Sequence, residues 1–167
     1  KSLDYINQLT YLDISDSNIS LETIKNYTNL ETLILQKCSL DDQNLSLLNS
    51  LTNLKRLDVS NNELLEEHFN GQLDATKLTK LESLAIGGNE ITTLPEVIPS
   101  LESLKTLDLT NSYNLTTIDC LSGLDIEELI LDECSSIGND LTSNTEYADT
   151  FFSTIESLEN LKKLSIV

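Results

Sequence analysis

Aliphatic residues recur along this chain in a short pattern that returns at intervals of 21 to 35 residues. The segments that begin at Leu9, Leu30, Leu54 and Leu81 have aliphatic residues at their first, fourth, sixth and eleventh positions. Because alternate side chains of a strand point to opposite faces, the fourth and sixth positions indicate a short strand with one buried face. The pattern therefore predicts a row of short strands, each with an outward residue between its two buried ones.

Three further segments keep the first half of this pattern. Those at Leu104 and Ile126 carry one extra residue before the last aliphatic position, and LKKLSIV begins at Leu161. The four regular segments fit L-x-x-L-x-L-x-x-N-x-L, so the chain resembles the leucine-rich repeat family. The resemblance implies an α/β solenoid with right-handed curvature, a concave parallel β-sheet and a convex side of mixed helical and extended segments. We expect residues 1–167 to form one leucine-rich repeat domain of six to seven repeats, as a fragment of a longer chain.

The ninth position of each repeat is small or polar, and in the family it forms a ladder at the turn after the strand. An asparagine there can satisfy backbone groups that the turn would otherwise leave unpaired, whereas serine and cysteine are expected to do this less completely. The ladder residues are Ser17, Cys38, Asn62, Asn89, Ser112 and Cys134.

Between two strands the chain must return along the convex side, and the sequences of these return segments predict different structures. Leucines at helical spacing over residues 45–51, after Asp41 and Asp42, predict a helix that starts at these two acids. Pro95 and Pro99 predict an extended return or a short tight helix. Residues 138–161 predict a helix of about three turns, with Phe151 and Phe152 in the core.

Charge limits the partners. The chain holds 28 acidic and 10 basic residues, which give a formal net charge of −18. This charge repels phosphate backbones and anionic lipid headgroups, so nucleic acid is excluded as a partner. The sequence also shows no membrane-inserting run and no pocket for a small-molecule substrate.

No set of residues predicts catalysis, a cofactor or a metal site, so the chain is not expected to be an enzyme. His68 is predicted to lie on the surface of a convex loop. Gly87 and Gly88 fit no phosphate-binding pattern. Cys38, Cys120 and Cys134 have no paired spacing and are read as semi-buried thiols without a redox role.

The outward strand positions predict a partner-binding concave face. The chosen residues line neighbouring strands in two columns, with one residue in the turn that follows: Tyr11, Asp13, Ile34, Arg56, Asp58, Thr106, Asp108, Glu128, Ile130 and Asp132. Ile34 and Ile130 are candidate anchors, with contact to flanking elements as the alternative. The acidic cluster at residues 125–133 is a candidate dock for a basic partner segment, with a solvated strand edge as the alternative.

The leading hypothesis is a non-catalytic scaffold that binds another protein. Sparse cysteines favour a cytoplasmic location. Two alternatives stay open: a bacterial surface or secreted protein that resembles internalins and binds host proteins, and the recognition arm of a larger enzyme.

Overall fold

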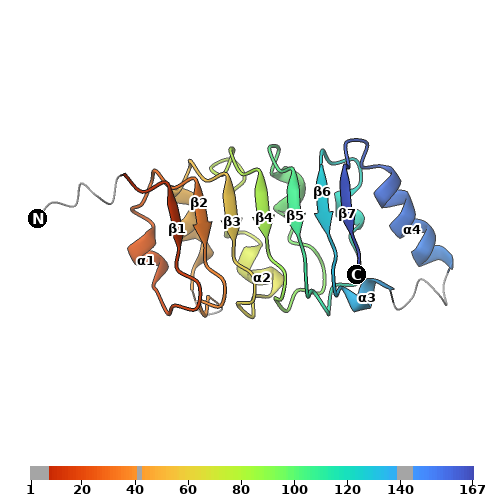
Figure 1. Cartoon of the computed structure of the whole chain (residues 1–167), viewed down its shortest axis with the longest axis horizontal. Helices are drawn as coiled ribbons and strands as arrows, with labels where there is room; N and C mark the ends of the chain where they lie inside the picture. Colours follow the sequence, from red (N-terminus) through yellow and green to blue (C-terminus); the bar gives the residue numbers. More distant parts are fainter. Residues whose placement is uncertain (1–7, 41–42, 139–144) are drawn as a thin grey trace, which may run out of the picture.

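The computed structural model describes residues 8–40, 43–138 and 145–167, and its main feature is one parallel sheet. Seven three-residue strands lie side by side in sequence order (Figure 1). The strands are β1 Tyr11–Asp13, β2 Thr32–Ile34, β3 Arg56–Asp58, β4 Ser83–Ala85, β5 Thr106–Asp108, β6 Glu128–Ile130 and β7 Lys163–Ser165. Each strand pairs with the next one along the chain, so the repeats stack as a solenoid.

The register of the sheet is the register of the sequence repeats. Tyr11 pairs with Thr32, Thr32 with Arg56, and the same position continues across every strand to Lys163. The third position of each repeat therefore forms a straight column across the strands, and so do the fourth and the fifth positions. The repeat alignment predicted these columns, and the pairing confirms them.

The core consists of stacked aliphatic layers. The fourth-position leucines of β2 to β6 are almost fully buried, and leucines of the return segments pack against them. Because each layer contacts mainly its neighbours, the stability of the solenoid comes from stacking one repeat on the next.

The ninth-position ladder is present, and Asn62 at its centre is only 2% exposed. Its Oδ1 accepts the Cys38 backbone N–H at 2.7 Å, and its Nδ2 donates to the carbonyls of Leu35, Val59 and Ser60 at 2.8 to 3.0 Å. Asn89 repeats the arrangement one layer on, since its Oδ1 accepts the Asn62 N–H at 2.8 Å. One amide thus ties two turns together.

The two ladder cysteines replace the amide with a thiol. Cys38 Sγ donates to the Ile14 carbonyl at 3.2 Å, and Cys134 Sγ donates to the Leu109 carbonyl at 3.1 Å. Burial raises the pKa of both thiols, that of Cys134 to about 11, so both remain protonated donors at neutral pH. Ser112 is too short for this role, and its buried Oγ has no hydrogen-bond partner among the described residues.

The eighth position, one residue before the ladder, adopts a left-handed backbone in six successive repeats, with φ between 52° and 64°. Only one of the six residues is a glycine. The shared conformation places every ladder residue at the same point of its turn, so the ladder depends on this kink as well as on its own side chains. The six residues are Asp16, Lys37, Asn61, Gly88, Asn111 and Glu133.

The return segments are mixed, as the resemblance implied. The α-helices are α1 Leu21–Ile24, α2 Glu66–Phe69, α3 Ser135–Gly138 and α4 Thr145–Glu156, and the 3₁₀ helices are η2 Leu45–Ser50, η3 Ile98–Ser100 and η4 Asp119–Leu121. The short tight helix at the two prolines is confirmed by η3.

Two expectations for the returns need correction or qualification. The helix after Leu40 is a 3₁₀ helix, and its N-cap is Asn44. The Asn44 side chain accepts the Ser46 N–H at 2.9 Å. Asp41 and Asp42, the predicted start, lie outside the described residues. In α4 the predicted length is confirmed and Phe151 is buried, but Phe152 is 57% exposed. Adjacent helical positions point about 100° apart, so both rings cannot face the same core.

Glu66 of α2 joins two return segments and provides a test by pH. Burial raises the pKa of this carboxyl, but hydrogen bonds from the Thr92 hydroxyl and the Thr92 and Thr93 backbone outweigh it and lower the pKa from 4.5 to about 2. A depressed pKa stabilises the fold above pH 4.5, and this stabilisation disappears as the pH falls toward 2. We expect the stability advantage of the native chain over Glu66→Gln to shrink across that window.

Urea unfolding at several pH values measures this difference. The exposed neighbour Glu67 supplies the control, because a Glu67→Gln curve should run parallel to that of the native chain. A constant gap between native and Glu66→Gln from pH 6 to pH 2 would contradict the assignment.

Candidate partner-binding face

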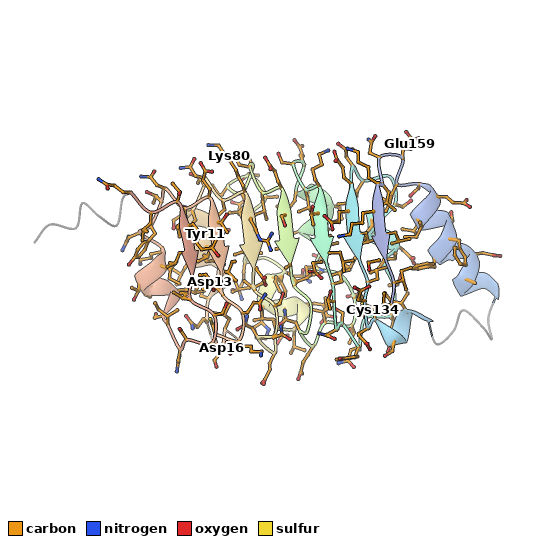
Figure 2. All side chains as sticks on the ribbon, viewed as in Figure 1. Tyr11, Asp13, Asp16, Lys80, Cys134 and Glu159 are labelled. Carbon is orange, nitrogen blue, oxygen red and sulfur yellow. The ribbon has the colours of Figure 1, made fainter. Side chains whose placement is uncertain are left out.

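The predicted contact residues lie where the repeat pattern put them. The third-position column holds Tyr11, Thr32, Arg56, Ser83, Thr106, Glu128 and Lys163, and every member is at least partly exposed. The fifth-position column beside it holds Asp13, Ile34, Asp58, Ala85, Asp108, Ile130 and Ser165. Figure 2 shows Tyr11 and Asp13 one after the other along β1, with Asp16 in the turn below. Asp132 lies in the turn after β6.

The fifth-position column is less exposed than the sequence suggested. Asp58 is 3% exposed and Ala85 is 7% exposed, whereas Asp13 is open to solvent and Asp108 is half-buried. Gln36 lies against Asp58, since its Nε2 donates to Asp58 Oδ2 at 2.6 Å. The predicted anchors Ile34 and Ile130 are half-buried.

The three aspartates of this column share a structural task. Asp13 Oδ1 accepts the Ser15 N–H, Asp58 Oδ1 accepts the Ser60 N–H, and Asp108 Oδ1 accepts the Thr110 N–H, all at 2.9 to 3.1 Å. Each bond joins the aspartate to the residue two positions later, and it stabilises the turn that follows the strand. The Ser15 hydroxyl and N–H bonds also lower the pKa of Asp13. The three repeats that have Ile or Ala instead of Asp lack this side-chain acceptor, and their residue two positions on is Gln, Gly or Asp rather than Ser or Thr.

A charge pattern at the second position was missed by the sequence analysis. From β2 to β7 the signs alternate without exception: Glu31, Lys55, Glu82, Lys105, Glu127 and Lys162. Lys55 Nζ lies 2.9 Å from Glu31, and Lys162 Nζ lies 2.6 Å from Glu127. This alternation of charge could have been found by comparing the second positions of the aligned repeats. These charges largely neutralise one another, so this edge of the sheet attracts neither sign strongly.

The acidic cluster at β6 is also paired. Lys105 contacts Asp125, Lys162 contacts Glu127 and Lys163 contacts Glu128. The Ser165 hydroxyl donates to Asp132 Oδ1 at 2.7 Å. The cluster is therefore less available to a basic partner than its sequence suggested.

The remaining candidate chemistry is structural. His68, predicted on the surface, is half-buried in α2, and its Nδ1 accepts the Leu65 N–H at 2.8 Å. Cys120 is exposed, while the two ladder cysteines are buried. Across residues 8–40, 43–138 and 145–167, no cluster of His, Cys, Asp or Glu has metal-site geometry. No helix in this part of the chain is long and apolar enough to cross a membrane.

Comparison with known proteins agrees with this geometry. The sequence model described as Leucine Rich Repeat matches residues 53–72, which include β3 and its ladder residue Asn62. The chain has the leucine-rich repeat fold. Its fold is similar to an internalin (inlF) of Listeria monocytogenes, with a TM-score of 0.62 and 17% identity over 98% of this chain and 49% of that one. Internalin C2 (inlC2) of the same bacterium gives a TM-score of 0.57 and 20% identity over 99% of this chain and 66% of that one.

Two curated proteins are similar to part of the chain. Protein STRUBBELIG-RECEPTOR FAMILY 1 of Arabidopsis thaliana is 36% identical over 49% of the chain, and Toll-like receptor 2 of Boselaphus tragocamelus is 30% identical over 65%. The aligned region spans 10% of the first protein and 14% of the second.

Proposed function

We propose that this leucine-rich repeat domain is a non-catalytic scaffold that binds a partner protein on its sheet face. The observation that carries the proposal is the third-position column, where seven side chains of varied chemistry stand in register and remain accessible. The motif residues are used for the core and ladder, so the third position can vary from repeat to repeat without loss of the fold. A rigid surface with variable side chains is suited to recognition of another protein.

The relatives support a binding role. Two are receptors by name, and the aligned part lies within much longer proteins. A stacked-repeat solenoid offers an extended surface of the kind that repeat proteins use for binding. The half-buried and exposed residues Tyr11, Arg56, Thr106 and Glu128 are the proposed contacts of the third-position column.

Blocking the face tests the proposal. The double variant Ser83→Trp and Thr106→Trp places two large rings on neighbouring strands without removing a core or ladder residue, and strands tolerate tryptophan well. The native chain, this variant and Glu67→Trp on α2 are used as bait in a lysate of the producing cells. We expect the native chain and Glu67→Trp to capture the same partner, and the strand variant to lose it.

Circular dichroism and urea unfolding first establish that all three chains are folded. Equal capture by all three would place binding on another surface and overturn the proposal. Loss of capture by Glu67→Trp, with capture retained by the strand variant, would move the site to the return side.

A further inference from the structure

The basic side chains at the second and third positions of the repeats follow one rule, with one exception. Each lysine there lies against an acid of a neighbouring repeat: Lys55 with Glu31, Lys105 with Asp125, Lys162 with Glu127 and Lys163 with Glu128. The remaining base, Arg56, forms no ion pair and no side-chain hydrogen bond with a described residue. It is exposed at the third position of β3, near the middle of the sheet.

The side chains beside Arg56 are small and carry hydroxyl groups. Thr32 pairs with it from β2, Ser83 pairs with it from β4, and Thr106 stands one strand further on β5. All three are partly exposed, and their hydroxyls form no bond with a described residue. Neighbouring strands are about 4.8 Å apart, so a group placed on the guanidinium also lies near the hydroxyls of Thr32 and Ser83. These four residues form the Arg56 patch.

The acid nearest along the strand, Asp58, is not free to pair with Arg56. Its Oδ1 accepts the Ser60 N–H at 3.0 Å, and its Oδ2 accepts a bond from Gln36 Nε2 at 2.6 Å. Asp58 is only 3% exposed, so this carboxylate belongs to the turn and not to the binding surface. Because the neutral amide of Gln36 holds Oδ2, the Arg56 guanidinium retains its N–H donors for a group from outside the chain.

The chemistry of the Arg56 patch defines its ligand. A guanidinium has only donors, and the surrounding hydroxyls can also donate, so the patch requires an anionic acceptor. A carboxylate matches the two parallel N–H groups of arginine in a bidentate pair. A doubly charged phosphoryl group would meet stronger repulsion from a chain whose net charge is −18. The patch therefore favours a carboxylate.

We propose that Arg56 is the anchor of the sheet face and binds the carboxylate of an aspartate or glutamate of the partner protein. The hydroxyls of Thr32 and Ser83 donate to the same carboxylate, and Gln36 is a positioning residue that keeps Asp58 from competing for Arg56. Arginine is enriched among the residues that dominate binding at protein interfaces. This inference rests on the proposed function and identifies the chemistry of the partner's contact.

Selected peptides supply a defined ligand for the test. Random peptides of about twelve residues, which are long enough to span the sheet, are displayed on phage and selected against the full chain. The recovered peptides are synthesised, and fluorescence polarisation measures their Kd. We expect them to share an aspartate or glutamate, and replacement of this acid by its amide should weaken binding at least tenfold. Phosphoserine in its place should not restore the affinity.

Substitutions at Arg56 show where the acid binds. Arg56→Ala should weaken binding of the selected peptides at least tenfold. Arg56→Lys keeps the charge but loses the bidentate geometry, so its affinity should lie between those of Arg56→Ala and the native chain. Lys77→Ala removes the same charge from an exposed position of the return segment after α2 and should change the affinity less than twofold.

The role of Gln36 has its own test. Gln36→Leu keeps the size of the side chain but releases Asp58 Oδ2, so Asp58 can compete for Arg56 and peptide binding should weaken about threefold or more. In the double variant with Arg56→Ala there is no guanidinium to compete for. We therefore expect the double variant to bind as Arg56→Ala does, whereas independent losses from the two substitutions would contradict the positioning role.

The outcomes separate this inference from the proposed function. The carboxylate proposal is overturned if no peptide or only acid-free peptides are recovered, if phosphoserine binds more tightly than the acid, or if Arg56→Ala and Lys77→Ala have equal effects. If the tryptophan variant still loses the captured partner in that case, the sheet face binds through other residues and the proposed function stands. If the tryptophan variant captures the partner normally, the proposed function fails, whatever the peptides do.

Discussion

Replacing Asn62 by alanine should lower the free energy of unfolding by about 4 kcal/mol, which is a large share of the stability of a domain this size. The substitution removes the acceptor of the Cys38 N–H and the donor to three carbonyls, all inside the turn region. Water cannot replace these bonds without opening the stack, because Asn62 is buried. Urea unfolding followed by circular dichroism measures the loss.

The chain itself suggests the control for this substitution. Cysteine takes the same ladder position at Cys38 and Cys134 and donates to the carbonyl of the preceding repeat. Asn62→Cys should therefore retain part of the network and cost about half as much as Asn62→Ala. If the two variants are equally destabilised, packing rather than hydrogen bonding explains the ladder.

Gly87→Ala is expected to cost about 2–3 kcal/mol, because the added methyl group has no space. A Cβ built on Gly87 would lie 2.1 Å from the Thr110 carbonyl oxygen and 2.7 Å from the Thr110 nitrogen. Both are backbone atoms of the next turn, so relief requires movement of that turn and of the ladder beside it. The same unfolding measurement applies.

Gly123→Ala is the matched control for this clash. A Cβ there would meet no atom within 4 Å, although the φ of +75° makes any side chain strained. We expect this control to cost about 1 kcal/mol from backbone strain alone. Equal losses at Gly87 and Gly123 would show that conformation, and not the approach of the Thr110 backbone, limits the turn.

The fold was predictable because its constraints are local and repeated. The spacing of Leu12 and Ile14 within one repeat, aligned with Leu33 and Leu35 in the next, predicted the strands, their parallel order and their register. The ladder was predictable for the same reason, since Asn62 stands at a fixed distance from its strand. The thiol bonds of the cysteines were underestimated, because sequence does not show how close a buried sulfur lies to a carbonyl.

The candidate face was predictable in position but not in its balance of charge. The alignment located Asp58 and Glu128 correctly in their columns. It could not show that Gln36 would bury the first, or that Lys163 would pair with the second, because both contacts come from neighbouring strands. Phe152 fails for a related reason: helical periodicity allows one of two adjacent rings to face inward, and only packing decides which.

The alternation of signs across the strands gives the array a parity. If the single repeat that begins at Leu81 were deleted, Lys55 would stand beside Lys105 and Asp58 beside Asp108, and like charges on adjacent strands repel. If two successive repeats were lost, opposite signs would still be neighbours, and Glu31 would meet Lys105. We therefore expect the array to tolerate gain or loss of two repeats better than of one. For charge pairing between strands the structural unit is two repeats, whereas the leucine pattern repeats with every single one.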